Sequence, residues 1–362
     1  MFKLPKIIAI LGPTASGKTD VGIFLAKKFN GEVVSFDSRQ IYIGMDIGTA
    51  KPRRDGTPSA HSSKEGDSEL TRQRSLPVSS TGQAIAQVDG DNHPLAPSLK
   101  MRGEYVVDGV RHHLVDFIDP DQDYSLADFK QDAVRAIADI LGRGKLPILV
   151  GGTGLYFWAV IDNLEIPKVV PDKKLRNELE KLSLSELVKM LRAKDPESAR
   201  VVDLENPRRV LRALEVALSG ESFVKQQKKG KPLYDVLQIG LNWEREELNE
   251  RINKRVDRQM EAGLVAETEG LARDPTLALP FLKREGKCEV WALPSMSGIG
   301  YRQMGYFLRG EMSLPEAVEI LKRDTRHYAK RQMTWFKRNQ RIKWIERDDK
   351  KAVGELVEKF IE

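Results

Sequence analysis

The sequence predicts an α/β protein in which a parallel sheet carries helices on both faces and a small, wholly helical domain is inserted into the chain. Three observations support this fold class. Between Lys6 and Asp162, short apolar segments of strand length alternate with segments of helical period. From Asp172 to Gly220 the pattern is helical throughout. Strand character then returns at residues 234–241 (YDVLQIGL).

The expected strands are short and apolar, as strands in a helix-covered parallel sheet are. They lie at residues 6–11, 32–36, 147–150 and 234–241. The first helix is expected at residues 17–29 and another in the segment GLYFWAVI after Gly152. A third begins at Ser125, which with Asp128 resembles a capping box, and a similar pair, Ser313 and Glu316, opens a helix in the C-terminal region.

These elements divide the chain. Residues 1–163 and 234–362 are assigned to the α/β core with its C-terminal helices, and residues 164–233 to the inserted helical domain. Residues 53–102 are rich in Ser, Gly, Pro, Asp and Lys and lack a hydrophobic period, which predicts a flexible surface insertion. A shorter irregular stretch spans about 273–297.

Composition narrows the class of protein. The chain has 362 residues, of which 40% are hydrophobic and 31% charged, and no apolar run approaches the ~20 residues of a membrane helix. The first residues run directly into a strand, so no secretory signal is expected. A single cysteine, Cys288, excludes an internal disulfide and a cysteine-built zinc site. We therefore expect a cytoplasmic protein that does not enter a membrane.

The formal net charge is only +6, but basic residues gather in one segment, residues 322–343, with aromatic residues among or beside them. The basic residues are Lys322, Arg323, Arg326, Lys330, Arg331, Lys337, Arg338, Arg341 and Lys343, and the aromatic ones Tyr328, Trp335, Phe336 and Trp344. Cations beside aromatic rings suit a phosphate backbone and unstacked bases. A solvated helix face with core aromatics has the same pattern, so this segment alone does not decide for nucleic acid.

The strongest single motif is GPTASGKT at residues 12–19, a GxxxxGK[ST] phosphate-binding loop (P-loop) between the first strand and the first helix. It predicts a P-loop NTPase-like core. Its backbone N–H groups would face phosphate oxygens at a helix N-terminus, Lys18 would add a cation, and the Thr19 hydroxyl could hold Mg²⁺. The loop does not reveal whether the phosphates belong to ATP or to another molecule.

Two further polar turns follow expected strands and should therefore meet the P-loop at the same sheet edge. The first starts at Asp37, whose carboxylate could act as a general base or could only satisfy its own loop. The second is GGTG at residues 151–154, which includes Thr153 and which tight packing alone could also explain.

Eight blocks in this order resemble the successive motifs of the tRNA dimethylallyltransferase (IPP transferase) family, bacterial type. They are GPTASGKT, DSRQIYIGMDIGTAKP (37–52), HHLVDFIDP (112–120), YSLADF (124–129), LVGGTGLYF (149–157), NPRRVLRALEV (206–216), GYRQM (300–304) and KRQMTWFKR (330–338). They cover most of the chain outside the two irregular stretches. The long insertion departs from the compact family pattern, and the chain has no appended Cys/His zinc finger.

The resemblance implies transfer of a dimethylallyl group from dimethylallyl diphosphate to N6 of the adenosine next to the anticodon, in tRNAs that read codons beginning with U. The implied catalytic residues are Asp37 as base, Lys18, Thr19, Thr153 and Arg255. The diphosphate would contact Gly12, Thr14, Ala15, Ser16, Gly17, Lys18 and Thr19, with Mg²⁺ at Thr19. Contacts to the tRNA anticodon stem-loop are implied for Asp37, Ser38, Arg39, Gln40, Thr153, Arg208, Arg209, Val210, Leu211, Arg212, Lys330 and Arg331.

The residues fit that chemistry. Breaking an allylic C–O bond leaves negative charge on the diphosphate, which amides, Lys18, Mg²⁺ and an arginine would stabilise. The adenine amine needs a base to take its proton, and a base in an RNA loop can leave its stack to reach one. Three alternatives remain: a P-loop kinase of small molecules, a prenyltransferase of free adenine nucleotide, and a non-catalytic tRNA-binding protein. We expect a monomer.

Overall fold

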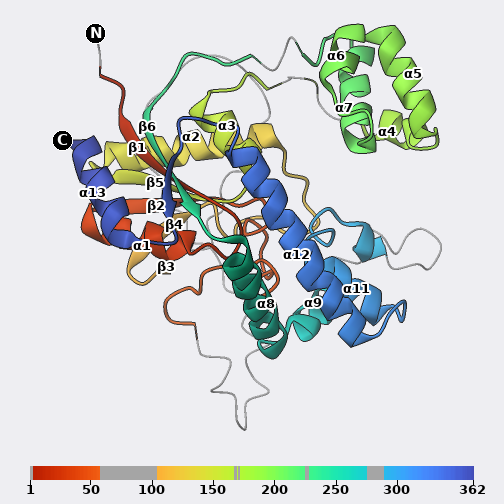
Figure 1. The fold of residues 1–362 in the computed structure, drawn as a ribbon. Coiled ribbons are helices and arrows are strands. Elements are labelled where there is room, and N and C mark those ends of the chain that lie inside the picture. The colour runs from red at the N-terminus through yellow and green to blue at the C-terminus, as the bar shows by residue number, and fades with distance from the viewer. Residues whose placement is uncertain (1–2, 58–103, 167–168, 170–171, 225–227, 275–288) are drawn as a thin grey trace, which may run out of the picture.

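The computed structural model describes residues 3–57, 104–166, 169, 172–224, 228–274 and 289–362 (Figure 1). Apart from residues 53–57, the predicted insertion at 53–102 lies outside the described residues, and so does the centre of the irregular stretch at 273–297. Among the described residues, no helix combines the length and the apolar character that a membrane span requires.

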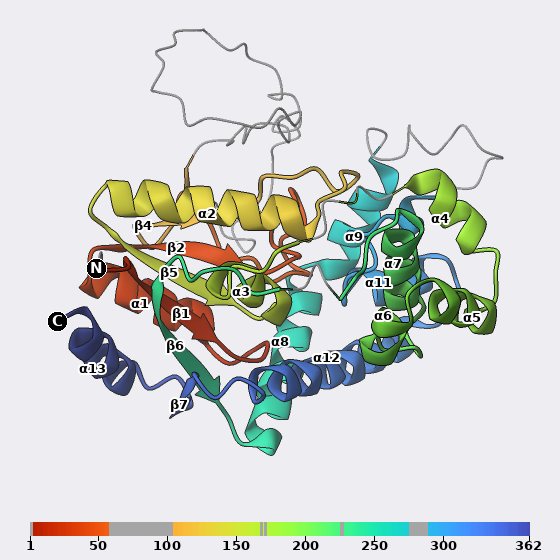
Figure 2. The same cartoon turned by 90° about the horizontal axis from the view of Figure 1, so that it is seen from above.

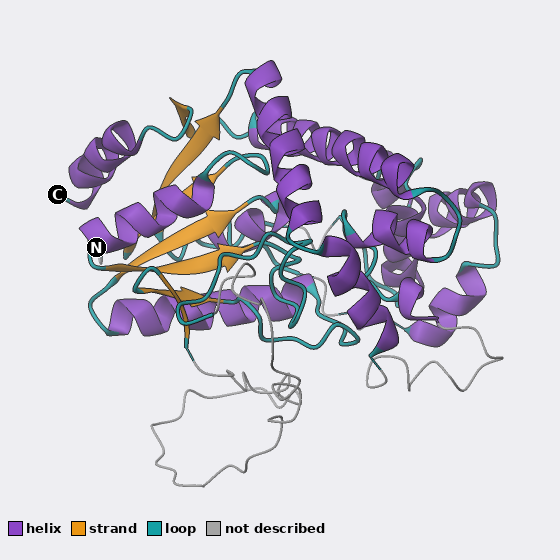
Figure 3. Cartoon of the chain, turned by 90° about the horizontal axis from the view of Figure 1, so that it is seen from below, coloured by secondary structure: helices purple, strands orange, loops and turns teal. Residues whose placement is uncertain are grey.

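One sheet forms the centre of the described chain, and its strands lie side by side with helices on both faces (Figure 3). The strand order is β3 (Tyr105–Val107), β4 (Val110–His113), β2 (Gly31–Phe36), β5 (Leu146–Gly151), β1 (Lys6–Leu11), β6 (Asp235–Asn242) and β7 (Lys343–Glu346). Only β3 pairs antiparallel. The predicted α/β class and parallel sheet are confirmed, whereas β3, β4 and β7 were not predicted.

The residues of β1 show how the sheet is buried, because successive side chains of a strand point to opposite faces. Ile8 and Ile10 pack with α1 (Lys18–Lys28) and α13 (Lys350–Ile361). Ile7, Ala9 and Leu11 pack with α2 (Leu126–Gly142), α3 (Gly154–Ile161) and the end of α12 (Leu314–Phe336). The predicted capping box of Ser125 and Asp128 opens α2. Figure 2 shows α2 and α13 on opposite sides of the strands.

The helices described between β6 and β7 gather near the carboxyl ends of the parallel strands. Together with α12 they are α8 (Arg245–Glu261), α9 (Leu264–Arg273), the 3₁₀ turn η1 (Glu289–Ala292) and α11 (Tyr301–Leu308). Their apolar residues enclose Ile41, Tyr42 and Met45 from the segment after β2. This packing brings the C-terminal part of the chain against the edge where ligands of α/β sheets bind.

Four helices between β5 and β6 have an apolar core of their own, and Figure 1 shows them as a separate bundle. They are α4 (Lys173–Leu179), α5 (Leu184–Lys194), α6 (Pro196–Val201) and α7 (Pro207–Leu218). Two segments connect this bundle to the sheet, one after α3 and one before β6, and they meet near Asp162. This carboxylate forms ion pairs with Lys229 (2.9 Å) and Arg341 (2.7 Å). Leu164 and Lys229 form an antiparallel bridge between the same connections.

Candidate active site

The P-loop lies between β1 and α1, as predicted, and its backbone is held from outside. Gly17 adopts φ +87°, a left-handed conformation that favours glycine, and a Cβ there would lie 2.6 Å from the Asp348 carboxylate, which would have to move. Trp243 Nε1 donates to Ser16 O (3.1 Å) and Arg251 Nε to Ala15 O (2.8 Å). The N–H and C=O of a trans peptide point in opposite directions. The N–H groups of Ser16 and Gly17, which belong to the same two peptide units, are therefore turned away from α8.

Lys18 is the cation of the loop. Its Nζ donates to Pro13 O (2.5 Å) and lies 3.4 Å from Ser16 Oγ. Burial and, to a smaller degree, the nearby Arg255 guanidinium lower the pKa of Lys18 to about 7, and Asp37 opposes this shift. The protein thus supplies too little negative charge to stabilise the Lys18 ammonium fully. An anion bound in the cleft would supply the missing charge.

Gln332, on α12, joins the P-loop to the turn after β5. Its Oε1 accepts a hydrogen bond from the Thr14 amide (2.8 Å), and its Nε2 donates to Gly152 O (2.8 Å). Only 7% of its surface is exposed. Sequence reasoning missed this residue, although it stands directly after Lys330 and Arg331 in the KRQM block, where the neighbouring charges drew the assignment to tRNA.

Asp37 follows β2 and lies in the same cleft as Lys18 and Arg255. Its Oδ1 accepts a hydrogen bond from the Arg39 amide (2.8 Å), and the amide of Ser38, which lies between the two residues, donates to Thr153 Oγ1 (3.2 Å). One carboxylate oxygen thus shapes the turn, as expected if Asp37 satisfies its own loop, while the other remains for the role of general base. Among the described residues, none donates a hydrogen bond to Oδ2, which leaves this oxygen available to the amine of a nucleobase in the cleft.

Arg255, on α8, lines the cleft together with Lys18 and Asp37. Its one hydrogen bond within the described residues is a long one, from Nη2 to Thr49 O (3.5 Å). Burial lowers the pKa of Arg255, and the Asp37 carboxylate opposes that shift. An arginine remains charged in any protein, so this guanidinium has unused donors beside Lys18.

The cleft encloses about 610 Å³, including space open to solvent. Charged and polar residues make up much of its lining: Thr14, Lys18, Thr19, Asp37, Gln40, Arg255, Tyr328 and Gln332. Val33, Ala50, Pro52 and Val150 add apolar lining. His112 lies at its edge, and burial lowers the pKa of this histidine, which keeps it neutral. A phosphate group and a short apolar chain fit this combination of surfaces.

The residues predicted to contact tRNA fall in different places. Lys330 and Arg331 are exposed on α12, with the Arg331 guanidinium 5.9 Å from the Tyr328 ring centroid, and Tyr328 itself lines the cleft. Arg39 is already engaged, because its guanidinium donates to Pro294 O (2.5 Å) and Ser297 Oγ (3.2 Å). Gln40 faces the cleft and bonds the segment that follows it.

The five residues predicted on α7 belong to the separate bundle. Arg208 and Arg209 are exposed, whereas Val210 (0% exposed) and Leu211 (8%) pack into the bundle core. Arg212 donates to Glu215 (3.1 Å) and to Val169 O (2.9 Å). An RNA contact by Val210 or Leu211 would require that core to open, so the two exposed arginines are the members of this set that a phosphate backbone can reach.

The sequence matches the IPP transferase family over residues 102–339 and the isopentenyl transferase family over residues 5–60. A tRNA dimethylallyltransferase of Acetivibrio thermocellus is 37% identical over 96% of this chain and 93% of its own length. A tRNA dimethylallyltransferase 2 of Geotalea uraniireducens is 39% identical, over 94% of this chain and 92% of its own.

Solved structures agree with these relatives. A tRNA isopentenylpyrophosphate transferase from Bacillus halodurans is 34% identical, with a TM-score of 0.59, over 98% of this chain and 95% of that one. A eukaryotic dimethylallyltransferase acting on tRNA is 25% identical, with a TM-score of 0.68, over 99% and 79% respectively. With its phosphate loop, carboxylate and arginine in one cleft and its relatives spanning nearly its whole length, the chain belongs to the IPP transferase family.

Proposed function

We propose that this protein transfers the dimethylallyl group of dimethylallyl diphosphate to N6 of the adenosine next to the anticodon, in tRNAs that read codons beginning with U. The observation that carries the proposal is the shared cleft of the P-loop, Asp37 and Arg255. It puts a carboxylate and two cations around one space. The relatives named tRNA dimethylallyltransferase support the same reaction.

In the reaction, the N6 nitrogen forms a bond to C1 of the dimethylallyl group as the bond from C1 to the diphosphate oxygen breaks. The electron pair of that bond leaves with the diphosphate, and the N6 proton passes to Asp37 Oδ2. Lys18 and Arg255 stabilise the charge that develops on the diphosphate. Thr153 holds the Ser38 amide and thereby fixes the turn that carries Asp37.

A magnesium ion is part of the proposal. The Thr19 hydroxyl lines the cleft beside Lys18, and Mg²⁺ is commonly held by one or two protein oxygens together with phosphate oxygens and water. Within the described residues there is no cluster of three His, Cys, Asp or Glu side chains for a metal, so phosphate oxygens would complete the site. When bound, the ion would neutralise charge on the leaving group.

The tRNA would approach across the exposed basic end of α12 and the exposed arginines of α7. The Arg331 guanidinium lies 5.9 Å from the ring of Tyr328, which reaches the cleft, so a backbone held by Arg331 lies close to the reacting groups. We propose that the protein acts as a monomer in the cytoplasm. A small-molecule kinase would give this basic surface no task, and the family relationship does not favour that alternative.

The test is an incubation with unmodified tRNA and either labelled dimethylallyl diphosphate or labelled ATP. We expect label from the prenyl donor in tRNA, at the adenosine next to the anticodon, and none from ATP. A tRNA with guanosine at that place and free AMP serve as acceptor controls and should stay unlabelled. Phosphate transfer from ATP, or prenylation of AMP in preference to tRNA, would refute the proposal.

A further inference from the structure

The segment at residues 45–52, which follows β2, forms one wall of the cleft. Ala50 and Pro52 line the cleft directly. Two cleft side chains take their orientation from its carbonyl groups, because Gln40 Nε2 donates to Thr49 O (3.5 Å) and Ala50 O (3.3 Å), and Arg255 Nη2 to Thr49 O (3.5 Å). This irregular segment therefore contacts both Gln40 and Arg255 through long hydrogen bonds, while Ser35 Oγ donates to Gln40 Oε1 at the other end of that side chain (3.2 Å).

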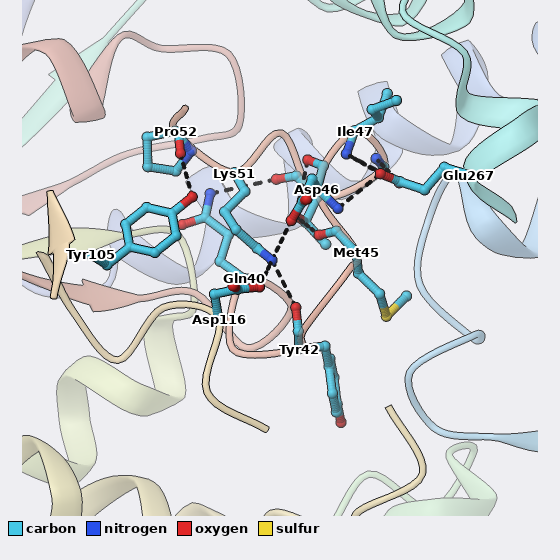
Figure 4. A network of polar contacts seen from close by, with 12 residues as sticks. Gln40, Tyr42, Met45, Asp46, Ile47, Lys51, Pro52, Tyr105, Asp116 and Glu267 are labelled. Atoms are coloured by element: carbon cyan, nitrogen blue, oxygen red, sulfur yellow. Dashed lines mark hydrogen bonds and ion pairs between the residues drawn. The ribbon is translucent and has the colours of Figure 1, made fainter. Parts of the chain in front are cut away.

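Glu267 on α9, which is not among the residues that line the cleft, holds the segment through its carboxylate (Figure 4). It accepts the amides of Asp46 (3.0 Å), Ile47 (2.8 Å) and Gly48 (3.1 Å). It also accepts the Tyr301 hydroxyl at 2.6 Å, and both burial and that carboxylate raise the pKa of Tyr301, so the phenol remains a donor. An ionised carboxylate offers about four acceptor positions and no donor, which matches these four donors.

Two more groups fix the same segment. Lys51, whose side chain is 1% exposed, donates to Tyr42 O (2.8 Å) and pairs with Asp46 (2.5 Å) and Asp116 (2.6 Å). Its charge is thus used inside the protein and is not available to a phosphate. Gln259 donates to Ile47 O (2.6 Å), and it lies four residues after Arg255 on α8.

We propose that Glu267 is a positioning residue for donor binding: by gathering the amides of residues 46–48 it fixes the cleft wall and, through Thr49 O, the Arg255 guanidinium. The inference rests on the proposed function, since it concerns the diphosphate that the cleft binds. Arg255 has no other hydrogen bond among the described residues that would hold it. Loss of the Glu267 acceptors should therefore weaken diphosphate binding, although Glu267 itself does not line the cleft.

The informative change is Glu267→Gln. The amide keeps the size of the carboxylate, but it replaces one acceptor oxygen with an NH₂ group that faces backbone donors. Tyr301→Phe is the milder companion, because it removes one of the four donors and leaves the carboxylate with the three amides. Glu269→Gln is the matched control: Glu269 is on the same helix and pairs with the exposed Arg273 (2.6 Å).

The measurement is the Kd of inorganic diphosphate by calorimetry, with the Kd of tRNA and the melting temperature as parallel readouts. Glu267→Gln should raise the diphosphate Kd by about tenfold or more, the equivalent of about 1.4 kcal/mol, and leave the tRNA Kd unchanged. Tyr301→Phe should raise it by less, about threefold, and Glu269→Gln should match the parent. Because inorganic diphosphate carries no prenyl group, the result does not depend on whether prenyl transfer to tRNA occurs.

A role in folding alone would give a different pattern: a lower melting temperature and fewer binding-competent molecules, with the parental Kd in the folded fraction. That pattern would overturn the proposal, as would a diphosphate Kd of Glu267→Gln within about twofold of the parent, well short of the tenfold expected from one lost charged hydrogen bond. If Glu267→Gln does not fold, Tyr301→Phe decides, and an unchanged diphosphate Kd for that variant would overturn the proposal.

Discussion

Gln332→Leu tests whether α12 holds the phosphate loop in place. Leucine has nearly the same volume but can neither accept from the Thr14 amide nor donate to Gly152 O, each 2.8 Å from the glutamine. An unsatisfied buried polar group costs about 1–3 kcal/mol, so two such groups amount to about 2–6 kcal/mol. Thr14 lines the cleft, where water can hydrogen-bond its amide, and we therefore expect a loss of about 2–3 kcal/mol, at the low end of that range.

The assay is urea unfolding followed by circular dichroism, with Lys330→Leu, an exposed position on the same helix, as the control. The Gln332→Leu protein should also bind diphosphate more weakly, because its P-loop is no longer fixed against the turn after β5. A free energy of unfolding within about 0.5 kcal/mol of the parent, the usual range for neutral surface changes, would refute the reasoning. Gln332→Glu adds a second check: protonation at low pH restores a donor toward Gly152 O, so its defect should shrink as the pH falls.

Three further predictions follow from the structure. Changing Lys330 and Arg331 together to Ala should reduce the slope of log K against log salt for tRNA binding by roughly 1.4–1.8, at about 0.7–0.9 per phosphate contact, with diphosphate binding unchanged; an unchanged slope would remove the pair from the tRNA surface. Because the pKa of Lys18 is lowered from 10.5 to about 7 and only its protonated form attracts an anion, kcat/KM for the donor should fall as the pH rises above about 7, and Lys18→Arg should lack this decline. The same lowered pKa means that the unfolded chain binds more protons between the two values, so the stability of the ligand-free protein should rise with pH across that window. Glu215 is buried and pairs with Arg176 at 2.5 Å and with Arg212 at 3.1 Å, and both arginines are partly exposed. Glu215→Gln should therefore destabilise the α4–α7 bundle by about 1–3 kcal/mol, seen as faster hydrogen exchange in α4 and α7 but not in β1; equal exchange in both places would contradict an independent bundle core.

Much of the fold follows from local pattern. The four strands expected from short apolar runs are present, and so are α1 and the helices opened by the capping boxes at Ser125 and Ser313. Strands β3 and β4 form a local hairpin whose turn is Asp108-Gly109, a signal that the sequence analysis overlooked. Strand β7 was missed because its pairing depends on a distant partner. In β7, Lys343–Glu346 reads as part of a basic surface segment, yet it completes the sheet beside β6.

The site shows the same division. The P-loop, Asp37 and the turn at Thr153 follow predicted strands, and the parallel sheet therefore brings them together, as local reasoning expects. The contributions of Gln332 and Glu267 come from helices remote in sequence, and they depend on where those helices pack. On α7 the resemblance assigned the whole segment 208–212 to tRNA, and it therefore did not separate Arg208, which is exposed, from Val210, which is buried.

Single-turnover prenyl transfer by Asp37→Asn, at saturating tRNA and donor, tests the central claim most directly. Asparagine keeps the Oδ1 that accepts the Arg39 amide at 2.8 Å, so the turn should survive while the base is lost. We expect the rate to fall by about 10²–10⁴, the usual contribution of a positioned general base, with tRNA and diphosphate affinities close to those of the parent. A rate within about threefold of the parent, far short of that range, would remove Asp37 from the mechanism.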